Sequence, residues 1–429
     1  MTTRKELLPG VFLTSIQDGR FKTACFSLSF LRPLRAGEAA MNALLPSVLL
    51  RGSEKTPSIR ALADRLDELH GASIGALVRK KGEIQLTGLF ADCLEDQYAG
   101  EAVFSHLLDF VSELLFCPRT EHGAFVPELV SQECRNLQNA MQSVLDDKSA
   151  YCERQLLRAM CRGERYACGR LGEPEELDKI DVRTLWAHDK SVLASSRVEL
   201  FYLGSKSVGE AEALLQPLLA HLPRTACVPV GTNPSPLPQE LRRFSETMPL
   251  AQSRISLGFR TDVTLRSAQY PAMLLLNAML GGGEQNRLYT VVRGRMALCY
   301  EAGSWYDGHK GILAASAGCG RTDPAGEPEA GKPGRPAVPE NAPFLCGGTE
   351  YAARLYGQGL CALGGYLHRQ GGAAAGRRCR QAGRAQSPQG NVPRLRDPGY
   401  GCGGGDPVGG GCPPGRPFDP PSVRRPGGL

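Results

Sequence analysis

Residues 270–280 read Tyr-Pro-Ala-Met-Leu-Leu-Leu-Asn-Ala-Met-Leu, and the run Gly281-Gly282-Gly283 follows directly. The first stretch predicts an apolar helix. The glycines predict its C-terminal turn, because glycine readily adopts the positive φ angles that such turns use. They do not form a phosphate-binding loop, since they follow a helix rather than a strand and no Gly-Lys-Ser/Thr comes next. This part of the chain therefore indicates a helix and turn inside a packed unit.

The first half of the chain alternates between strand-like and helix-like segments. Residues 26–31 alternate like a strand with one buried face, and a helix expected from about 37 to 50 ends at Arg51-Gly52-Ser53. An amphipathic helix is expected over 58–69. A hairpin over 74–89 and a helix over 103–115 follow. Mixed strands and helices of this kind predict an α+β fold.

From about residue 5 to 318 these segments resemble the insulinase/pitrilysin family of zinc metallopeptidases. In the second domain of that family an apolar helix ends in a glycine-rich turn. The next helix carries an Arg and, seven residues later, a Tyr follows; Arg293 and Tyr300 have that spacing. The resemblance implies two homologous units, each a β-sheet with helices packed on one face, the second of them incomplete here. It also implies that Arg293 and Tyr300 bind the substrate carbonyl, and that the loop Gly281–Gly283 contacts an extended substrate.

The catalytic helix of the family carries an inverted His-x-x-Glu-His motif. Its two imidazoles, one helical turn apart, bind zinc, and the glutamate activates the zinc-bound water. When the motif is anchored on Arg51-Gly52-Ser53, its functional slots fall on Ala43, Pro46 and Ser47. Both histidine ligands and the general base are therefore absent.

The third metal ligand is also absent at its expected place, near Ala140 or Met141. Glu128 and Glu133 lie on the same expected helix, and we interpret them as part of a solvated face. The seven histidines include no pair at i, i+3 or i, i+4, and no Cys-x-x-Cys occurs. We therefore predict no metal or cofactor held by this chain, with zinc only in a partner subunit.

These observations predict a non-catalytic peptidase homologue, a pseudoenzyme that is inactive by itself. In this hypothesis Arg293 and Tyr300 are presented to a zinc-bearing homologous subunit within a heterodimer, and the pair binds peptide for proteolysis. Two alternatives stay open: an active zinc metalloendopeptidase with unrecognised ligands, and a purely structural scaffold. In the scaffold, the arginine would pair with helix-end carbonyls and the tyrosine would be a core side chain.

Composition predicts a cytoplasmic protein. Acidic and basic residues interleave up to residue 318, so the net charge of +6 does not indicate nucleic-acid binding, and Arg79-Lys80-Lys81 is expected to be a solvated hairpin tip. We find no secretory signal pattern and no apolar run of about 18 residues, and so expect no membrane contact. The nine cysteines up to Cys299 show no disulfide framework, which predicts reduced, mostly buried thiols.

Proline and glycine mark the expected domain boundaries. We predict an N-terminal domain over 1–228, a proline-rich linker over 229–240, a partial second domain over 241–318 and a tail over 319–429. The tail holds 26 of the chain's 51 glycines and 16 of its 31 prolines. A proline and glycine content this high without a period predicts disorder.

A shift of reading frame would explain why this composition begins inside a domain. If codons 396–412 are read one base later, they are compatible with Glu-Thr-Leu-Asp-Thr-Val-Ala-Ala-Ala-Val-Thr-Pro-Ser-Glu-Ala-Val. That sequence is an amphipathic helix followed by a Thr-Pro-Ser-Glu capping start. Just before it, codons 389–393 are compatible with Lys-Glu-Met-Ser. We therefore predict a frameshift between codons 318 and 331, with a true linker or interaction tail as the alternative.

Overall fold

A computed structural model describes residues 2–234, 241–248 and 252–320, all within one compact unit. The predicted tail lies outside these ranges except for its first two residues, which continue a strand as far as Gly320. Residues 229–234 of the predicted linker have no regular secondary structure, and 235–240 lie outside the description. The predicted division into domains therefore stays a prediction.

The larger sheet has six strands in the order β1-β2-β8-β3-β5-β4. Their bounds are Thr2–Leu8 for β1, Val11–Gln17 for β2, Thr23–Pro33 for β3, Ser73–Lys81 for β4, Ile84–Leu94 for β5 and Arg197–Gly204 for β8. β2 and β8 run parallel, and the other neighbours are antiparallel. The predicted strand and hairpin of this half are therefore confirmed as β3, β4 and β5.

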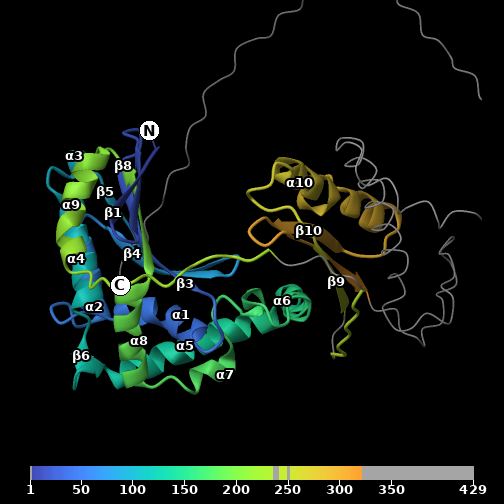
Figure 1. Cartoon of the computed structure of the whole chain (residues 1–429), viewed down its shortest axis with the longest axis horizontal. Helices are drawn as coiled ribbons and strands as arrows, with labels where there is room; N and C mark the ends of the chain where they lie inside the picture. The colour runs from blue at the N-terminus through green and yellow to red at the C-terminus, as the bar shows by residue number, and fades with distance from the viewer. Residues whose placement is uncertain (1, 235–240, 249–251, 321–429) are drawn as a thin grey trace, which may run out of the picture. The chain divides into compact units, whose positions relative to one another are not determined.

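Helices cover one face of this sheet (Figure 1). The helices of this half are α1 (Ala39–Leu49), α2 (Ile59–Glu68), α3 (Asp96–Ala99), α4 (Val103–Phe116), α5 (Pro127–Asp146), α6 (Lys148–Met160), α7 (Pro174–Leu177), α8 (Val182–Ser195) and α9 (Val208–Ala220). Helices α1, α4 and α9 contact the strands of this sheet directly, whereas α6 packs against the smaller, three-stranded sheet. A short helix η1 (Arg165–Ala167) and the two-stranded ribbon of β6 (Thr120–Glu121) and β7 (Ala124–Phe125) complete this part.

Alternation along the strands decides which face is covered. The residues of β3, β5 and β8 that point to the helices are apolar and almost fully buried, and they form the main core: Phe26, Leu28, Phe30, Leu89, Ala91, Val198, Leu200 and Tyr202. The opposite face is mixed: it carries apolar side chains such as Phe90 and Phe201, and Glu199 on it pairs with Arg4 at 2.7 Å. The α+β class predicted from the sequence is confirmed.

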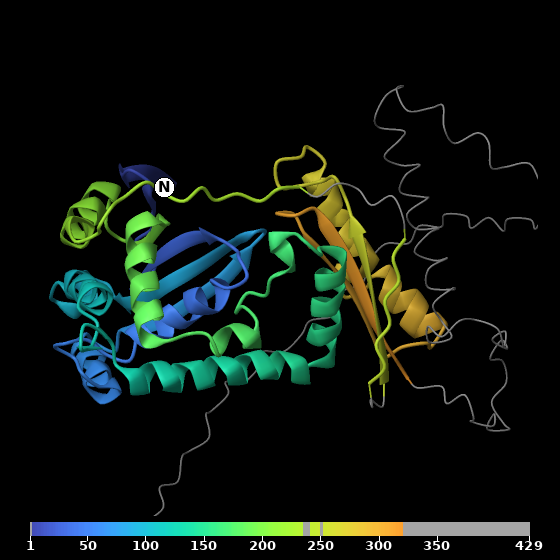
Figure 2. The same cartoon turned by 60° about the horizontal axis from the view of Figure 1, so that its bottom comes forward.

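The smaller sheet has three antiparallel strands in the order β10-β11-β9. They are β9 (Gln252–Arg260), β10 (Glu301–Asp307) and β11 (Ile312–Gly320). The predicted apolar helix is α10 (Tyr270–Asn277), which continues into the π-helical turn η2 (Ala278–Gly282); a second π-helical segment, η3 (Leu288–Arg295), follows (Figure 2).

The two faces of this sheet have different neighbours. Gly258 of β9 lies against Met160 of α6, and a side chain at this position would come within 2.7 Å of the Met160 sulfur. Ala315 points to the other face, since its neighbour Ala314 pairs with Gly258, and it packs with Leu288 and Val292 of η3. Helix α6 and segment η3 therefore lie on opposite faces.

The glycine run ends a helix as predicted, but the predicted reason is wrong. None of Gly281, Gly282 and Gly283 has a positive φ. Instead, a side chain on Gly281 would collide with the backbone nitrogen of Ser304 in β10. The run is needed where the helix end approaches the strand, because only glycine leaves room for the backbone.

Two composition-based expectations can be compared with the described residues. The nine cysteines up to Cys299 form no disulfide within the described residues, but only Cys93, Cys161 and Cys299 are buried, so the prediction of mostly buried thiols is wrong. No helix within the described ranges is long and apolar enough to cross a bilayer.

Gly88 allows a test of the packing between β3 and β5. It has a φ of 159°, and an added Cβ would collide with the carbonyl oxygen of Leu28. We expect Gly88→Ala to lower the free energy of unfolding by about 3 kcal/mol, since the paired strands cannot separate locally. Urea denaturation measures the change. Gly19→Ala is the matched control, because nothing lies within 4 Å of its added Cβ; equal losses for the two variants would contradict this account.

Candidate functional site

Helix α1 carries the three slots of the family's zinc motif, and it is an apolar, buried helix. Ala43 is 2% exposed, Pro46 is buried and Ser47 is half-buried. Pro46 has no backbone N–H, so the helical bond to the Asn42 carbonyl is not made. Apart from the Ser47 hydroxyl, these side chains offer no ligand atom, and in the part of the chain that the structure describes no three His, Cys, Asp or Glu residues gather as a metal site.

The expected position of the third ligand is also apolar. Met141 of α5 is 2% exposed and packs against Ala40 of α1 and Leu177 of α7. Ala140 is exposed and has no ligand atom. Helices α1 and α5 are therefore joined by carbon contacts in the region where the family's motif would place a cation.

One carboxylate does point from α5 to α1, and here the sequence interpretation was wrong. Glu133 is 6% exposed and forms an ion pair with Arg51, just beyond the C-terminal end of α1. Asn136 also donates to its Oε1 atom, at 3.1 Å. A buried carboxylate requires such partners, because its desolvation is costly. Glu128, in contrast, is exposed as predicted.

The sequence did contain a signal for the burial of Glu133. It lies three residues after Val130 and four before Leu137, and both of these pack into the main core. Residues at this spacing share one helix face. An acidic side chain on an apolar stripe indicates a buried pair rather than a solvated surface.

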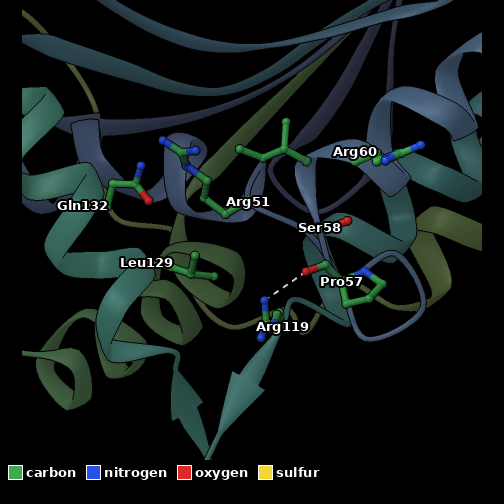
Figure 3. A pocket seen from close by; sticks show the side chains of 8 residues that line it. Arg51, Pro57, Ser58, Arg60, Arg119, Leu129 and Gln132 are labelled. Atoms are coloured by element: carbon green, nitrogen blue, oxygen red, sulfur yellow. Dashed lines mark hydrogen bonds between the residues drawn. The ribbon is translucent and has the colours of Figure 1, made fainter.

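An open pocket of about 380 Å³ lies beside this ion pair. Its lining residues come from the ends of α1, α2 and α5 and from the β6 region: Arg51, Pro57, Ser58, Ile59, Arg60, Arg119, Leu129 and Gln132. Arg119 donates to the Pro57 carbonyl at 2.9 Å. Figure 3 shows the guanidinium groups of Arg51 and Arg60 pointing to opposite sides. The arginines therefore do not converge on one anion.

A buried polar chain holds α1 against β5 and α8. His188 Nε2 lies 2.8 Å from Asn42 Oδ1, and Asn42 Nδ2 donates to Gln85 Oε1 at 3.0 Å. Gln85 in turn donates to the Ala39 carbonyl at 2.9 Å. Burial, together with the neighbouring Arg32 charge, lowers the pKa of His188 to about 4. The imidazole is thus neutral near pH 7 and orients α1 without binding metal.

Asp189, the next residue of α8, lies beside the slot of the absent general base. It is 2% exposed and lines a water-sized cavity with Pro46, Thr87 and Gly88. Its Oδ2 atom has no hydrogen-bond partner, and the nearest cation is Lys190 at 3.9 Å. Burial raises the pKa of Asp189 to about 7. The carboxyl is therefore easily neutralised, and it stands alone rather than within a ligand set.

The predicted substrate-binding residues Arg293 and Tyr300 lie in the second half, on exposed surface. Arg293 belongs to η3, and its guanidinium stacks 4.6 Å from the centre of the Tyr289 ring. Tyr300 precedes β10 and is 74% exposed, so it is not a core side chain. Its backbone N–H donates to the Gly318 carbonyl at 3.3 Å. The structure does not bring Arg293 and Tyr300 to the motif slots of α1.

Comparison with known proteins shows which proteins this chain is similar to. The family model described as the Peptidase M16 inactive domain matches residues 179–326. The chain is 28% identical over 305 residues to the probable inactive metalloprotease YmfF of Bacillus subtilis (strain 168), covering 71% of each. The chain is an M16-family homologue that lacks the zinc motif.

Solved structures show the same fold. The M16 homologue is similar to a conserved protein from Enterococcus faecalis V583, with a TM-score of 0.69 and 26% identity, covering 74% of this chain and 75% of that one. The peptidase M16 inactive domain from Pseudomonas fluorescens has a TM-score of 0.61 at 16% identity, covering 75% and 74%. The resemblance noted from the sequence is thus confirmed at the level of family and fold.

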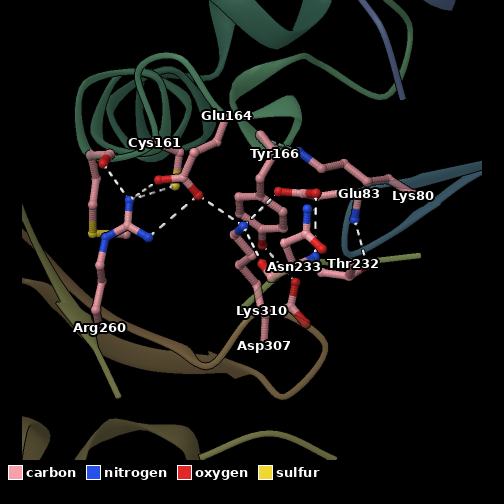
Figure 4. Close-up of polar contacts among 11 residues, drawn as sticks. Lys80, Glu83, Cys161, Glu164, Tyr166, Thr232, Asn233, Arg260, Asp307 and Lys310 are labelled. Atoms are coloured by element: carbon pink, nitrogen blue, oxygen red, sulfur yellow. Dashed lines mark hydrogen bonds and ion pairs between the residues drawn. The ribbon is translucent and has the colours of Figure 1, made fainter. Parts of the chain in front are cut away.

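The M16 homologue has a second buried polar cluster, which links its two sheets (Figure 4). Lys310, in the turn between β10 and β11, lies 2.6 Å from Glu83 and 2.8 Å from Glu164, and donates to the Asn233 carbonyl at 2.7 Å. Its side chain is 1% exposed. The cluster fixes the β4–β5 hairpin tip to the β10–β11 turn.

Lys80 belongs to the same region, so the prediction of a wholly solvated hairpin tip is wrong for it. Its ammonium donates to the carbonyls of Tyr166 and Cys168 at 2.6 and 3.0 Å. It also lies 4.1 Å from the centre of the Tyr166 ring. Burial lowers the pKa of Lys80. The neighbouring Arg79 and Lys81 are exposed, as predicted.

Asp189 should make stability depend on pH. Its folded pKa of about 7 lies above the ordinary value of 3.8, so folding is opposed as pH rises from about 4 to 7, when only the unfolded chain releases the proton. We expect Asp189→Asn to add up to about 4 kcal/mol at pH 8 and little at pH 4. Urea denaturation across this range tests it. Asp178→Asn, at an exposed site, is the control; a pH-independent effect of Asp189→Asn would contradict the assignment.

Removal of the buried cation should be costly. We expect Lys310→Ala to lower the free energy of unfolding by about 3–5 kcal/mol, because Glu83 would remain buried without its partner. The double variant Lys310→Met, Glu83→Gln should lose less, since it leaves no unpaired charge there. Lys55→Ala, at an exposed position, is the control. Thermal unfolding of the three variants measures this, and a loss for the double variant at least as large as that for Lys310→Ala would refute the explanation.

Proposed function

We propose that this M16 homologue is a non-catalytic subunit that helps to bind peptide substrate for a zinc-bearing homologous partner. The observation that carries the proposal is the state of α1. Ala43, Pro46 and Ser47 occupy the ligand and base slots, and the helix is packed through apolar contacts. A helix without imidazole or carboxylate donors cannot polarise a water for peptide cleavage.

The second part of the proposal concerns Arg293 and Tyr300. A guanidinium and a phenol can donate hydrogen bonds to the oxyanion that develops on a scissile carbonyl, a form of stabilisation that is worth about 3–4 kcal/mol per donor. Such donors are useful only near a metal-activated water, which a partner would have to supply. The exposure of both side chains supports this role, because exposed groups are available to a partner-bound peptide.

Two further features belong to the same hypothesis. The loop Gly281–Gly283 would offer backbone groups to an extended substrate beside Arg293. The protein would act in the cytoplasm, where thiols stay reduced, and the nine free cysteines up to Cys299 are compatible with that compartment.

The proposed role belongs to a protein whose second unit is complete. The composition change near residue 318 and the codon compatibility of residues 389–412 support a frameshift. Resequencing of the DNA over codons 315–335 would decide this point, and an unchanged reading would exclude the frameshift.

Co-expression with a homologue that carries the full zinc motif tests the function. The chain alone should bind no stoichiometric zinc and cleave no peptide, whereas the pair should do both. In the pair, Arg293→Ala should lower kcat/KM about 100-fold or more, because a transition-state donor is lost. Tyr300→Phe should act in the same direction through loss of its hydroxyl.

Arg295→Ala is the matched control, since Arg295 is an exposed arginine on the same segment η3. It should leave kcat/KM unchanged. Unaltered turnover in all three variants would support a purely structural subunit instead. Stoichiometric zinc and chelator-sensitive cleavage by the chain alone would overturn the proposal in favour of an active enzyme.

A further inference from the structure

The apolar side chains of α10 and η2 are uncovered to a degree that is unusual for a helix of this composition. Leu274 is 45% exposed, Leu275 64% and Met279 59%, whereas Met273 is the only buried residue of α10. A helix that is apolar around its circumference is normally enclosed on all sides. Exposed apolar surface of this kind marks a place where another element belongs.

The first half of the chain shows which element that is, because the two halves repeat one arrangement. Along the first half, β3, α1, α2, β4 and β5 follow one another, and their strands lie in the order β3-β5-β4. Along the second half, β9, α10, η3, β10 and β11 follow one another, and their strands lie in the order β9-β11-β10. Helix α10 is therefore the counterpart of α1, and β9 that of β3.

In the first half, later elements of the chain cover α1. Helix α8 packs on it, and Val192 and Leu193 face Leu45 and Leu49. Helices α5 and α7 contact α1 as well. As a result, nine of the eleven residues of α1 are buried. All of these helices follow β5 in the chain, so their counterparts would follow β11.

The sheets show the same difference at their edges. In the first half, β8 pairs antiparallel with β3 on the side away from β5. In the second half, β9 pairs with β11 on one side and is an edge strand among the described residues. An edge strand leaves a row of backbone donors and acceptors for a further strand. The counterparts of both α8 and β8 are thus absent from the described second half.

The sequence indicates which codons could encode these elements. The match covers 71% of YmfF and 75% of the E. faecalis protein, so part of each relative lies outside it. Read one base later, codons 406–409 are compatible with Thr-Pro-Ser-Glu. This is a helix start with Thr as the N-cap, like Asp181, whose carboxylate caps the first turn of α8.

We propose that the segment encoded by these codons in the shifted frame forms a helix that covers Leu274, Leu275 and Met279, as α8 covers α1. The chain that follows it pairs with β9, as β8 pairs with β3. The described part of the chain then has an intact first unit and a second unit in which the docking face for these C-terminal elements is open.

A charged substitution on α10 distinguishes the open from the covered state. A frame-restored chain is made by deletion of one base between codons 318 and 331. Leu275→Asp should leave the Tm of the 429-residue chain within about 2 °C, because the side chain is solvated there. In the frame-restored chain it should lower the Tm by about 5 °C or more, because the new charge is buried.

Two control substitutions, one at an exposed position and one at a buried position, accompany this experiment. Ile59→Asp, at a 54% exposed position of α2 in the first unit, should be tolerated in both chains. Met273→Asp should destabilise both, since Met273 is already buried. An unchanged Tm for Leu275→Asp in the frame-restored chain would overturn the proposal. So would a dimeric 429-residue chain that Leu275→Asp dissociates in light scattering, because a second copy would then cover α10. The Tm and the light scattering are measured without a partner or peptide cleavage. This proposal can therefore fail while the proposed function stands, and the proposed function can fail while this proposal stands.

Discussion

The burial of α1 between β5 and the helices α5, α7 and α8 is the packing arrangement on which the first unit depends. The helix joins the sheet through Leu44, Leu45, Val48 and Leu49, and the chain from His188 through Asn42 to Gln85 fixes its orientation. Polar groups in this position are tolerated only because each donor finds an acceptor. The same arrangement places the former ligand slots against carbon atoms, so the fold is kept while the metal chemistry is lost.

The loss of a metal site changes the electrostatic demands of its surroundings. A zinc-binding helix needs carboxylates and imidazoles held close together, whereas Glu133 and Asp189, the buried carboxylates beside this helix, belong to no ligand set among the described residues. Glu133 is neutralised by Arg51. Asp189 has no strong partner, and burial raises its pKa to about 7. The cost of burying a negative charge is thus reduced by an ion pair at Glu133 and by protonation at Asp189.

The described part of the second half repeats the order of the first as far as the hairpin that corresponds to β4 and β5. Its three strands rely on α6 and on the Lys310 cluster for contact with the first half. In the first half, helices that follow the hairpin cover α1, whereas no counterpart of them lies among the described residues of the second half, where Leu275 is exposed. Local elements can form without this cover, but the apolar face they create is then unpaired.

Several features could be predicted from residues alone, because they depend on atoms or on local pattern. A side chain without a donor atom cannot bind zinc wherever it lies, so Ala43 and Pro46 settled the loss of the motif. Periodicity placed α1, α2 and α4 within about two residues of their bounds, and it placed α10 with the correct start but an end three residues late. In contrast, the pairing of Glu133 with Arg51, the burial of Lys80 and Lys310, and the approach of Gly281 to Ser304 depended on contacts between segments far apart in the chain. Only the tertiary structure decided these, since the burial of a polar group is set by what folds over it, and no local pattern records that partner.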